Sequence, residues 1–305
     1  MTNTTTLLAW RNIWRHPRRT LLTIAAMVFA DVLLIFMLGL QFGQYRMMID
    51  NSLAIFTGQM QVQAEGYNDE PHMYRSITAA DALAQDIRER TQLDAVATRG
   101  YGFALVSSES RTLGVQISGV DPLHEPRVST IPGLISQGRY LGEVDSNEIV
   151  IGSTLARNLK IKPGDELTVL GNGRDGSIAA TVAPVVGIYE SGSRDMDRHM
   201  LSMPLDTFRE VFSMDDQAHS IIIGGARDQA DSIAAAARAA LQQRESLVLL
   251  DWETLMPGLK QAIQADFTSA WFMYAVLIVL VAFGMLNTML MSVLERTHEF
   301  GILLA

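Results

Sequence analysis

The sequence predicts an α+β membrane protein in which two transmembrane helices with helical stalk extensions flank an exported α/β domain. Two apolar stretches, residues 21–40 and 271–293, are each about 20 residues long, which is enough to cross a hydrocarbon core. A long polar segment separates them. Four arginines and no acidic residue precede the first stretch, so the N-terminus is expected in the cytoplasm and the long segment outside.

Charge and composition exclude several classes of partner. The segment of residues 41–270 contains 19 Lys and Arg against 30 Asp and Glu, a difference of 11 negative charges. This acidity is compatible with export and argues against nucleic acid or an anionic lipid surface as the partner of this segment. The chain contains no cysteine, so the exported domain must be stabilised by its own core. The first apolar stretch is too long for a signal peptide and holds Asp31 at its centre, which favours an uncleaved helix.

The two ends of the chain are expected at the inner membrane surface. Residues 1–20 predict an amphipathic helix with tryptophans at the interface and arginines toward lipid phosphates, although a simple basic patch is the alternative. These interface residues are Trp10, Arg11, Trp14, Arg15, Arg18 and Arg19. Residues 21–56 read as the first span plus a stalk, about 54 Å long if fully helical. Residues 251–294 read as the second stalk and span, and residues 295–305 as a cytoplasmic segment.

Residues 57–250 are expected to form the exported core domain. Residues 59–64 alternate with period two and read as a half-buried strand, and residues 78–90 as a helix with Thr78 as its N-cap. Residues 165–170 and 179–189 predict a hairpin, and residues 229–244 an Ala-rich helix. Because residues 121–202 are rich in Gly and in strand patterns, we expect a β-rich subdomain inserted into the α/β one.

Catalytic and metal-binding motifs fail on their context. The GxGxxG match at residues 171–176 is followed by a strand pattern and not by a helix, so it reads as a hairpin loop. A P-loop, an HExxH helix and a GxSxG elbow do not occur in the sequence, and the histidines are scattered. We predict no catalytic residue, no metal site and no cofactor bound by this chain, which is therefore interpreted as a non-enzyme.

Polar residues in two other places are candidate functional sites. Asp31 and Asn287 lie within the apolar stretches, where an ionised carboxylate costs roughly 2.5 kcal/mol or more. Structural pairing with a neighbouring helix is the preferred interpretation, and a proton relay the alternative. The second place is the polar stretch of residues 190–199, which is flexible in composition and either a cargo contact or plain surface. Its candidate residues are Ser193, Arg194, Asp195 and Arg198.

Several segments resemble one family of membrane proteins. SVLERTHEFGILLA at residues 292–305 resembles the segment after the second transmembrane helix of MacB/FtsX/LolC-type ABC transporter permeases, with Phe300 in place of the usual Ile. LAWRNIWRHPRRTL at residues 8–21 is similar to the amphipathic start of these permeases. GRY at 138–140, NEIVIG at 147–152 and LKIKPGD at 159–165 resemble their exported core domain. Such permeases carry four transmembrane helices, so this chain, which ends at Ala305, is expected to be a fragment or a truncated permease.

The resemblance implies a mechanism and a set of partners. A separate cytoplasmic ABC ATPase dimer would use ATP and magnesium, and the stalks would carry its motion to the periplasmic domain. The coupling residues would be Glu295, Arg296, Glu299 and Gly301. Further implied partners are a second permease copy or paralogue, the bilayer of the bacterial inner membrane, and lipoprotein cargo or a periplasmic adaptor.

Lipoprotein release is the function that the proportions of the chain favour within this family. Alternatives are the export of a drug, toxin or lipid, and mechanical activation of a wall hydrolase. A two-span membrane sensor is a competing class, but Gly301 follows the second span too soon for a helical signalling linker.

Overall fold

The computed structural model describes residues 14, 17–109, 111–142, 146–242, 244–294 and 297. The chain divides into two compact units, Met1–Met48 with Gly258–Ala305, and Ile49–Pro257. We call the first unit the helix pair and the second unit the domain. The predicted coupling residues Glu295, Arg296, Glu299 and Gly301 lie outside the described residues, as do Trp10, Arg11 and Arg15.

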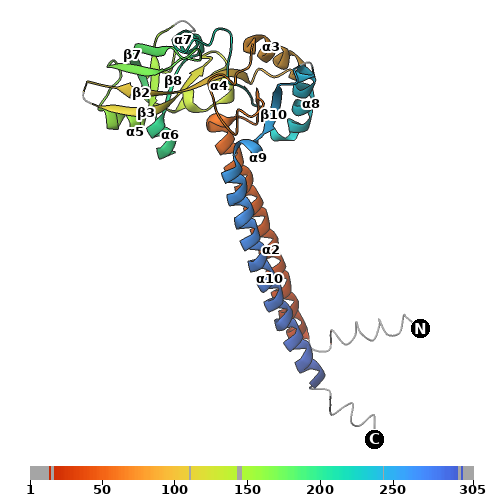
Figure 1. The fold of residues 1–305 in the computed structure, drawn as a ribbon. Coiled ribbons are helices and arrows are strands. Elements are labelled where there is room, and N and C mark those ends of the chain that lie inside the picture. Colours follow the sequence, from red (N-terminus) through yellow and green to blue (C-terminus); the bar gives the residue numbers. More distant parts are fainter. Residues whose placement is uncertain are drawn as a thin grey trace. The chain divides into compact units, whose positions relative to one another are not determined.

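The helix pair is formed by α2 (Pro17–Ser52) and α10 (Pro257–Leu294), which lie side by side (Figure 1). Each begins at a proline, whose fixed φ suits the first helical position and whose missing N–H would be unbonded there anyway. Both are long and apolar enough to cross a membrane. Large apolar side chains such as Phe29, Phe36 and Phe272 are exposed, as expected of helices that contact lipid. The prediction of two uninterrupted apolar helices is confirmed, and their orientation in a membrane stays a prediction.

The domain is built on one ten-stranded mixed sheet. Its strand order is β10-β1-β9-β2-β3-β8-β5-β7-β4, and β6 pairs with β2 and β7. The β3–β8 and β5–β7 pairs are parallel and the other pairs antiparallel. The strands are β1 (Met60–Ala64), β2 (Val96–Ser107), β3 (Thr112–Val120), β4 (Ile135–Gly138), β5 (Ile149–Gly152), β6 (Glu166–Asn172), β7 (Ile178–Tyr189), β8 (Met200–Pro204), β9 (Ser220–Ile223) and β10 (Leu247–Asp251).

Helices cover the sheet in two groups. The first group is α3 (Ala80–Thr91) and α8 (Ala230–Leu241), which pack on each other beside β1, β9 and β10. The second group lies along the β3, β5 and β8 part of the sheet and comprises α5 (Ser153–Leu159), α6 (Arg194–His199) and α7 (Leu205–Val211). The short remaining elements are η1 (Leu53–Thr57), α4 (Glu125–Val128), η2 (Ile131–Leu134), η3 (Arg227–Gln229) and α9 (Trp252–Leu255).

The domain has two main hydrophobic cores under this single sheet. One lies between α3, α8 and the strands β1 and β9, and the other is centred on β5, β6, β7 and α7. The long strand β2 takes part in both, with Val96 in the first core and Val106 in the second. A β-rich subdomain over residues 121–202 stays a prediction, because the sheet runs through both cores without a break.

Local predictions are confirmed where the turn chemistry was clear. The expected hairpin is β6 and β7, which pair antiparallel up to Asn172 and Ile178, so the GxGxxG match is a hairpin loop. Two expectations were wrong. Residues 60–64 are not half-buried, because β1 lies between β9 and β10 and buries Gln61 and Gln63 as well. Thr78 does not cap α3, which begins at Ala80 after a residue in the left-handed region.

Candidate functional site

A polar cluster joins α2 to α10 within the helix pair. The Tyr45 hydroxyl donates to the Asp266 carboxylate at 2.5 Å, and the Gln41 amide donates to the Tyr45 hydroxyl oxygen at 2.6 Å. On the other side, the Tyr274 hydroxyl donates to the Gln41 side-chain oxygen at 2.7 Å. We call Gln41, Tyr45, Asp266 and Tyr274 the clasp. Its hydrogen bonds connect two residues of α2 to two residues of α10, which fixes the register of the helices.

Aromatic rings lie beside the clasp. The Phe42 and Phe267 ring centroids are 6.3 Å apart, and Phe267 meets Trp271 edge-on at 6.5 Å. This level is where the apolar stretch of α10 begins at residue 271. Because Trp and Tyr are enriched where a transmembrane helix leaves the hydrocarbon, the clasp is at the level expected for a membrane–water interface.

The polar residues predicted within the two apolar stretches are not part of the clasp. Asp31 and Asn287 are both exposed on the helix pair, so the pairing predicted for Asp31 would need a group outside the described residues. Trp14 and Arg18 are exposed as well, and the side chain of Arg19 lies outside the described part. The structure therefore does not bring these predicted residues together, and their roles stay predictions.

The turn that follows α2 belongs to the domain, and its carbonyl groups are bonded to several other elements. After Ser52 the helix widens into the π-turn η1, which closes with the Gly58 N–H donating to the Leu53 carbonyl at 2.9 Å. Gly58 has φ +72° and lies against Ile222, so only glycine fits this turn. Single π-turns are frequent at functional sites.

Arg99 on β2 contacts this π-turn from below. Its guanidinium lies 3.9 Å from the centre of the Phe56 ring, and one of its Nη1 hydrogens is donated to the Phe56 carbonyl. Its Nε and Nη2 donate to the two Glu125 oxygens at 3.0 and 2.6 Å. Arg99 is 0% exposed and Glu125 1% exposed. Burial works against the charge of Arg99, but the Glu125 carboxylate outweighs it and raises the pKa of Arg99.

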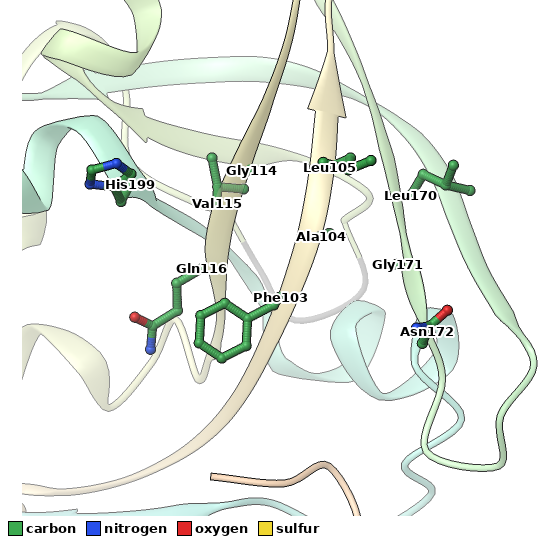
Figure 2. A pocket seen from close by; sticks show the side chains of 10 residues that line it. All are labelled: Phe103, Ala104, Leu105, Gly114, Val115, Gln116, Leu170, Gly171, Asn172 and His199. Atoms are coloured by element: carbon green, nitrogen blue, oxygen red, sulfur yellow. The ribbon is translucent and has the colours of Figure 1, made fainter. Parts of the chain in front are cut away.

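An apolar groove of about 600 Å³ lies on the outer face of the sheet (Figure 2). Leu105 of β2 faces Gly114 of β3 on one side and Leu170 of β6 on the other, and Phe103 stands next along β2. Phe103 is 66% exposed, and the same face continues on β7 with Ile178, which is 78% exposed, and Val182. The solvent face of an antiparallel sheet is normally polar, and an exposed apolar patch of this kind marks an interaction site.

The predicted cargo segment borders this groove. Residues 194–199 form the short helix α6, not a flexible loop, and His199 at its end lines the groove (Figure 2). Ser193 caps α6 through the Met196 N–H, and the buried Asp197 accepts two hydrogen bonds from Ser191 at 2.9 and 2.6 Å. These bonds order the segment, while Ser193, Arg194, Asp195 and Arg198 remain exposed.

Sequence reasoning missed the clasp, the Arg99–Glu125 pair and the apolar face. The last of these had a signal, because Phe103, Leu105, Ile178 and Val182 alternate along their strands with residues that are also apolar. Apolar residues on both faces of strands in an antiparallel sheet predict a second contact surface. Among the described residues, no cluster of His, Asp and Glu is arranged to hold a metal ion.

The chain thus consists of a domain built on a mixed sheet and of two helices that are long and apolar enough to cross a membrane. Comparison with known proteins identifies its class: residues 20–243 match the MacB-like periplasmic core domain, and the chain belongs to this family. The resemblance to MacB/LolC-type permeases is thereby confirmed.

Individual relatives are distant. The lipoprotein-releasing system transmembrane protein LolC of Neisseria meningitidis serogroup B is 21% identical over 263 residues, which are 82% of this chain and 63% of that protein. The chain thus spans less than two thirds of that relative.

Two solved structures show a similar course of the chain. The periplasmic region of MacB from Actinobacillus actinomycetemcomitans is 16% identical with a TM-score of 0.49, covering 68% of this chain and 94% of that one. The extracellular domain of the ABC-type transporter YknZ from Gram-positive bacteria is 16% identical with a TM-score of 0.45. The match covers 64% of this chain and 100% of that one.

Proposed function

We propose that the chain is part of an ABC transporter permease that couples ATP hydrolysis in a separate cytoplasmic ATPase to movement of its periplasmic domain. The proposed task is release of lipoproteins from the inner membrane. The observation that supports this most directly is the attachment of helix α2 to the sheet, through Arg99 and the carbonyl of Phe56. A helix that ends in hydrogen bonds to a central strand is able to transmit a displacement to the whole sheet.

The family of the chain and its distant relative support the coarser part of the proposal. The chain belongs to the MacB-like periplasmic core domain family, and its relative LolC is the transmembrane protein of a lipoprotein-releasing system. ATP would be bound by the partner ATPase, because the sequence of this chain contains no P-loop. Orientation in the inner membrane, with the N-terminus in the cytoplasm, rests on the four arginines before the first apolar stretch.

The apolar face supports the finer part, the lipoprotein cargo. A lipoprotein carries acyl chains, and each CH₂ that leaves water contributes about 0.8 kcal/mol. None of the ten residues that line the groove is Asp, Glu, Lys or Arg. An uncharged groove beside the polar helix α6 fits a ligand that has an apolar chain and a polar peptide end.

In-cell photocrosslinking tests the proposal. A photoreactive residue is placed at Ser193 or at Leu105 in the full-length permease, with Tyr74, exposed elsewhere on the domain, as the matched control. Adducts are identified by mass spectrometry. Acylated lipoproteins at Ser193 and Leu105 but not at Tyr74 are the expected result.

Other adducts assign the protein to other branches. A soluble wall hydrolase or an adaptor would indicate mechanical signalling, and a lipid or small molecule would indicate export of that class. Equal labelling from all positions, or none from Ser193 and Leu105, contradicts a cargo role of this face.

A further inference from the structure

The carbonyl groups of residues 54–57 are bonded to three different parts of the domain. The Ala54 oxygen accepts from the Thr130 N–H at 2.9 Å, and the Ile55 oxygen accepts from the Ser129 hydroxyl at 2.7 Å. The Phe56 oxygen accepts from Arg99. The Thr57 oxygen accepts from the Gln61 amide at 2.7 Å. We call these four carbonyls and their four donors the helix–sheet joint.

This arrangement is unusual for the end of a helix. The last four carbonyls of a helix have no partner within the helix and are normally bonded to water, to a glycine turn or to the side chain of a nearby residue. Here the donors come from β1, from β2 and from the connection between α4 and η2. Three separate segments of the domain therefore fix both the position and the direction of η1.

Arg99 connects the joint to the middle of the sheet. On β2 it lies opposite Val120 of β3 on one side and opposite Ser220 of β9 on the other. All three nitrogens of its planar guanidinium fork donate hydrogen bonds, two of them to Glu125 and the third to Phe56. Lysine would offer no such fork, since its ammonium is a point charge on a flexible stem.

Stability alone does not account for this pair. When both members of a buried ion pair are replaced by apolar residues, their desolvation cost disappears as well. The effect of such a replacement on stability is often neutral or favourable. What an apolar pair would not supply is the directed hydrogen bond to the Phe56 carbonyl and the contact with the face of its ring. The guanidinium of Arg99 therefore fixes the orientation of η1, which an apolar side chain would not do.

We propose that Arg99 is a positioning residue, held by Glu125, that makes η1 and the sheet one rigid element. Displacements of α2, which runs directly into η1, then reach the domain undiminished. The inference rests on the proposed function for its role in transport. Its structural part, the rigidity of the joint, stands independently of the cargo.

The test compares variants that keep the fold and differ in the joint. In Arg99→Met/Glu125→Leu both charges are replaced by apolar residues, and thermal unfolding of the full chain is expected within a few degrees of the native chain. Ser129→Ala serves as a milder second variant, because it removes the donor to the Ile55 carbonyl, together with the acceptor of the Ile131 N–H, and leaves Arg99 in place. The matched control is Arg90→Met/Asp86→Leu, which removes an exposed ion pair of α3.

Two measurements decide the proposal. The chain has no cysteine, so spin labels are attached to cysteines introduced at Met47 and Tyr74, both exposed positions, and the distribution of distances between them is measured in membranes. The second measurement is cargo released per ATP hydrolysed by the full-length permease with its ATPase. For the double variant we expect a clearly broader distribution of distances between the two spin labels. We also expect about ten-fold less cargo released per ATP hydrolysed, which corresponds to 1.36 kcal/mol in coupling. Ser129→Ala should show a smaller broadening, and the control none.

The opposite outcome overturns the inference. A folded double variant with the native distance distribution, or with the native amount of cargo per ATP, would show that Arg99 is not a positioning residue. If the native permease releases no lipoprotein at all, the proposed function fails. In that case the distance distribution alone still decides whether Arg99 makes the joint rigid.

Discussion

Tyr45 on α2 donates a hydrogen bond of 2.5 Å to the carboxylate of Asp266 on α10, across 221 residues of sequence. The two helices have no charged pair in their apolar stretches to hold them in register, and aliphatic side chains pack in many registers with similar energy. A directed bond from a phenol to a carboxylate selects one of them. The neighbouring Gln41 strengthens the choice by bonding both Tyr45 and Tyr274.

Tyr45→Phe is therefore expected to weaken the helix pair. Interhelical hydrogen bonds in membranes contribute about 0.6 kcal/mol on average and up to about 1.7 kcal/mol, so a loss of roughly 1 kcal/mol in the free energy of unfolding is predicted. Thermal unfolding of the full chain in lipid nanodiscs measures it. Tyr74→Phe removes the same atom from an exposed tyrosine of the domain and should have no effect. Equal midpoints for the two variants would contradict a stabilising role of the clasp.

A second prediction concerns the close packing of β2 on α7. A Cβ at Gly100 would collide with the ring of Phe208, which is fully buried and stacked on Phe212 at 4.6 Å. Gly100→Ala is expected to lower the free energy of unfolding by about 1–3 kcal/mol, the usual cost of overpacking. Urea unfolding followed by circular dichroism measures the change.

Gly114 on β3 provides the matched control. A Cβ there meets nothing within 4 Å, and Gly in a strand interior is less favourable than Ala by roughly 0.5–1 kcal/mol. Gly114→Ala should therefore be neutral or slightly stabilising. Similar losses for both variants would show that contact with Phe208 does not determine the effect at Gly100.

The elements that the sequence predicted well are those whose signal is local. The apolar helices and the β6–β7 hairpin follow from composition and turn residues within short windows. By contrast, Gln61 and Gln63 alternate with apolar residues and indicate an exposed face, yet both are buried. Their burial depends on β9 and β10, which come from the far end of the chain.

The groups of the candidate site could not be predicted for the same reason. Arg99 follows Val-Ala-Thr in a strand pattern, where an arginine normally indicates a solvent-facing position. Its partners Phe56 and Glu125 are 43 and 26 residues away, and nothing in the local pattern of either links them. Long-range polar contacts leave no periodicity, so the joint is visible only in the fold.

A third prediction concerns the coupling segment, which lies outside the described residues. The resemblance to permeases predicts that Glu299 contacts the ATPase. If it does, Glu299→Lys in the full-length permease should leave ATP hydrolysis intact and lower cargo release by about ten-fold, or 1.36 kcal/mol. Release from inverted vesicles, measured together with phosphate production, gives the ratio. Glu89→Lys makes the same charge change on the exposed face of α3 and should not alter it. Unchanged release per ATP in Glu299→Lys would remove this residue from the coupling segment.

His219 is the group of the domain for which we predict a pH dependence. Its ring is fully buried, stacks on Tyr67 at 5.1 Å and accepts the Tyr101 N–H at its Nδ1 at 2.9 Å. Burial lowers the pKa of His219 to about 4; the hydrogen bond to the Met73 carbonyl opposes this shift, and Arg174 adds to it. The native state therefore holds a neutral imidazole well below the pH at which an exposed histidine becomes charged.

The fourth prediction is that the domain loses stability as the pH falls from about 6.5 to about 4. In this window the unfolded chain binds a proton at His219 and the folded chain does not, so the free energy of unfolding decreases with decreasing pH. The full loss is about 3 kcal/mol, since each pKa unit corresponds to about 1.36 kcal/mol. In His219→Gln this part of the dependence of the free energy of unfolding on pH should vanish, although stability near neutral pH also falls because Gln fills the ring's place poorly.

Denaturant unfolding of both chains between pH 4 and 7 measures the difference, in which the shared titration of carboxylates cancels. His72→Gln, at an exposed histidine, should retain the native slope; parallel curves for the native chain and His219→Gln would show that His219 is not the group responsible.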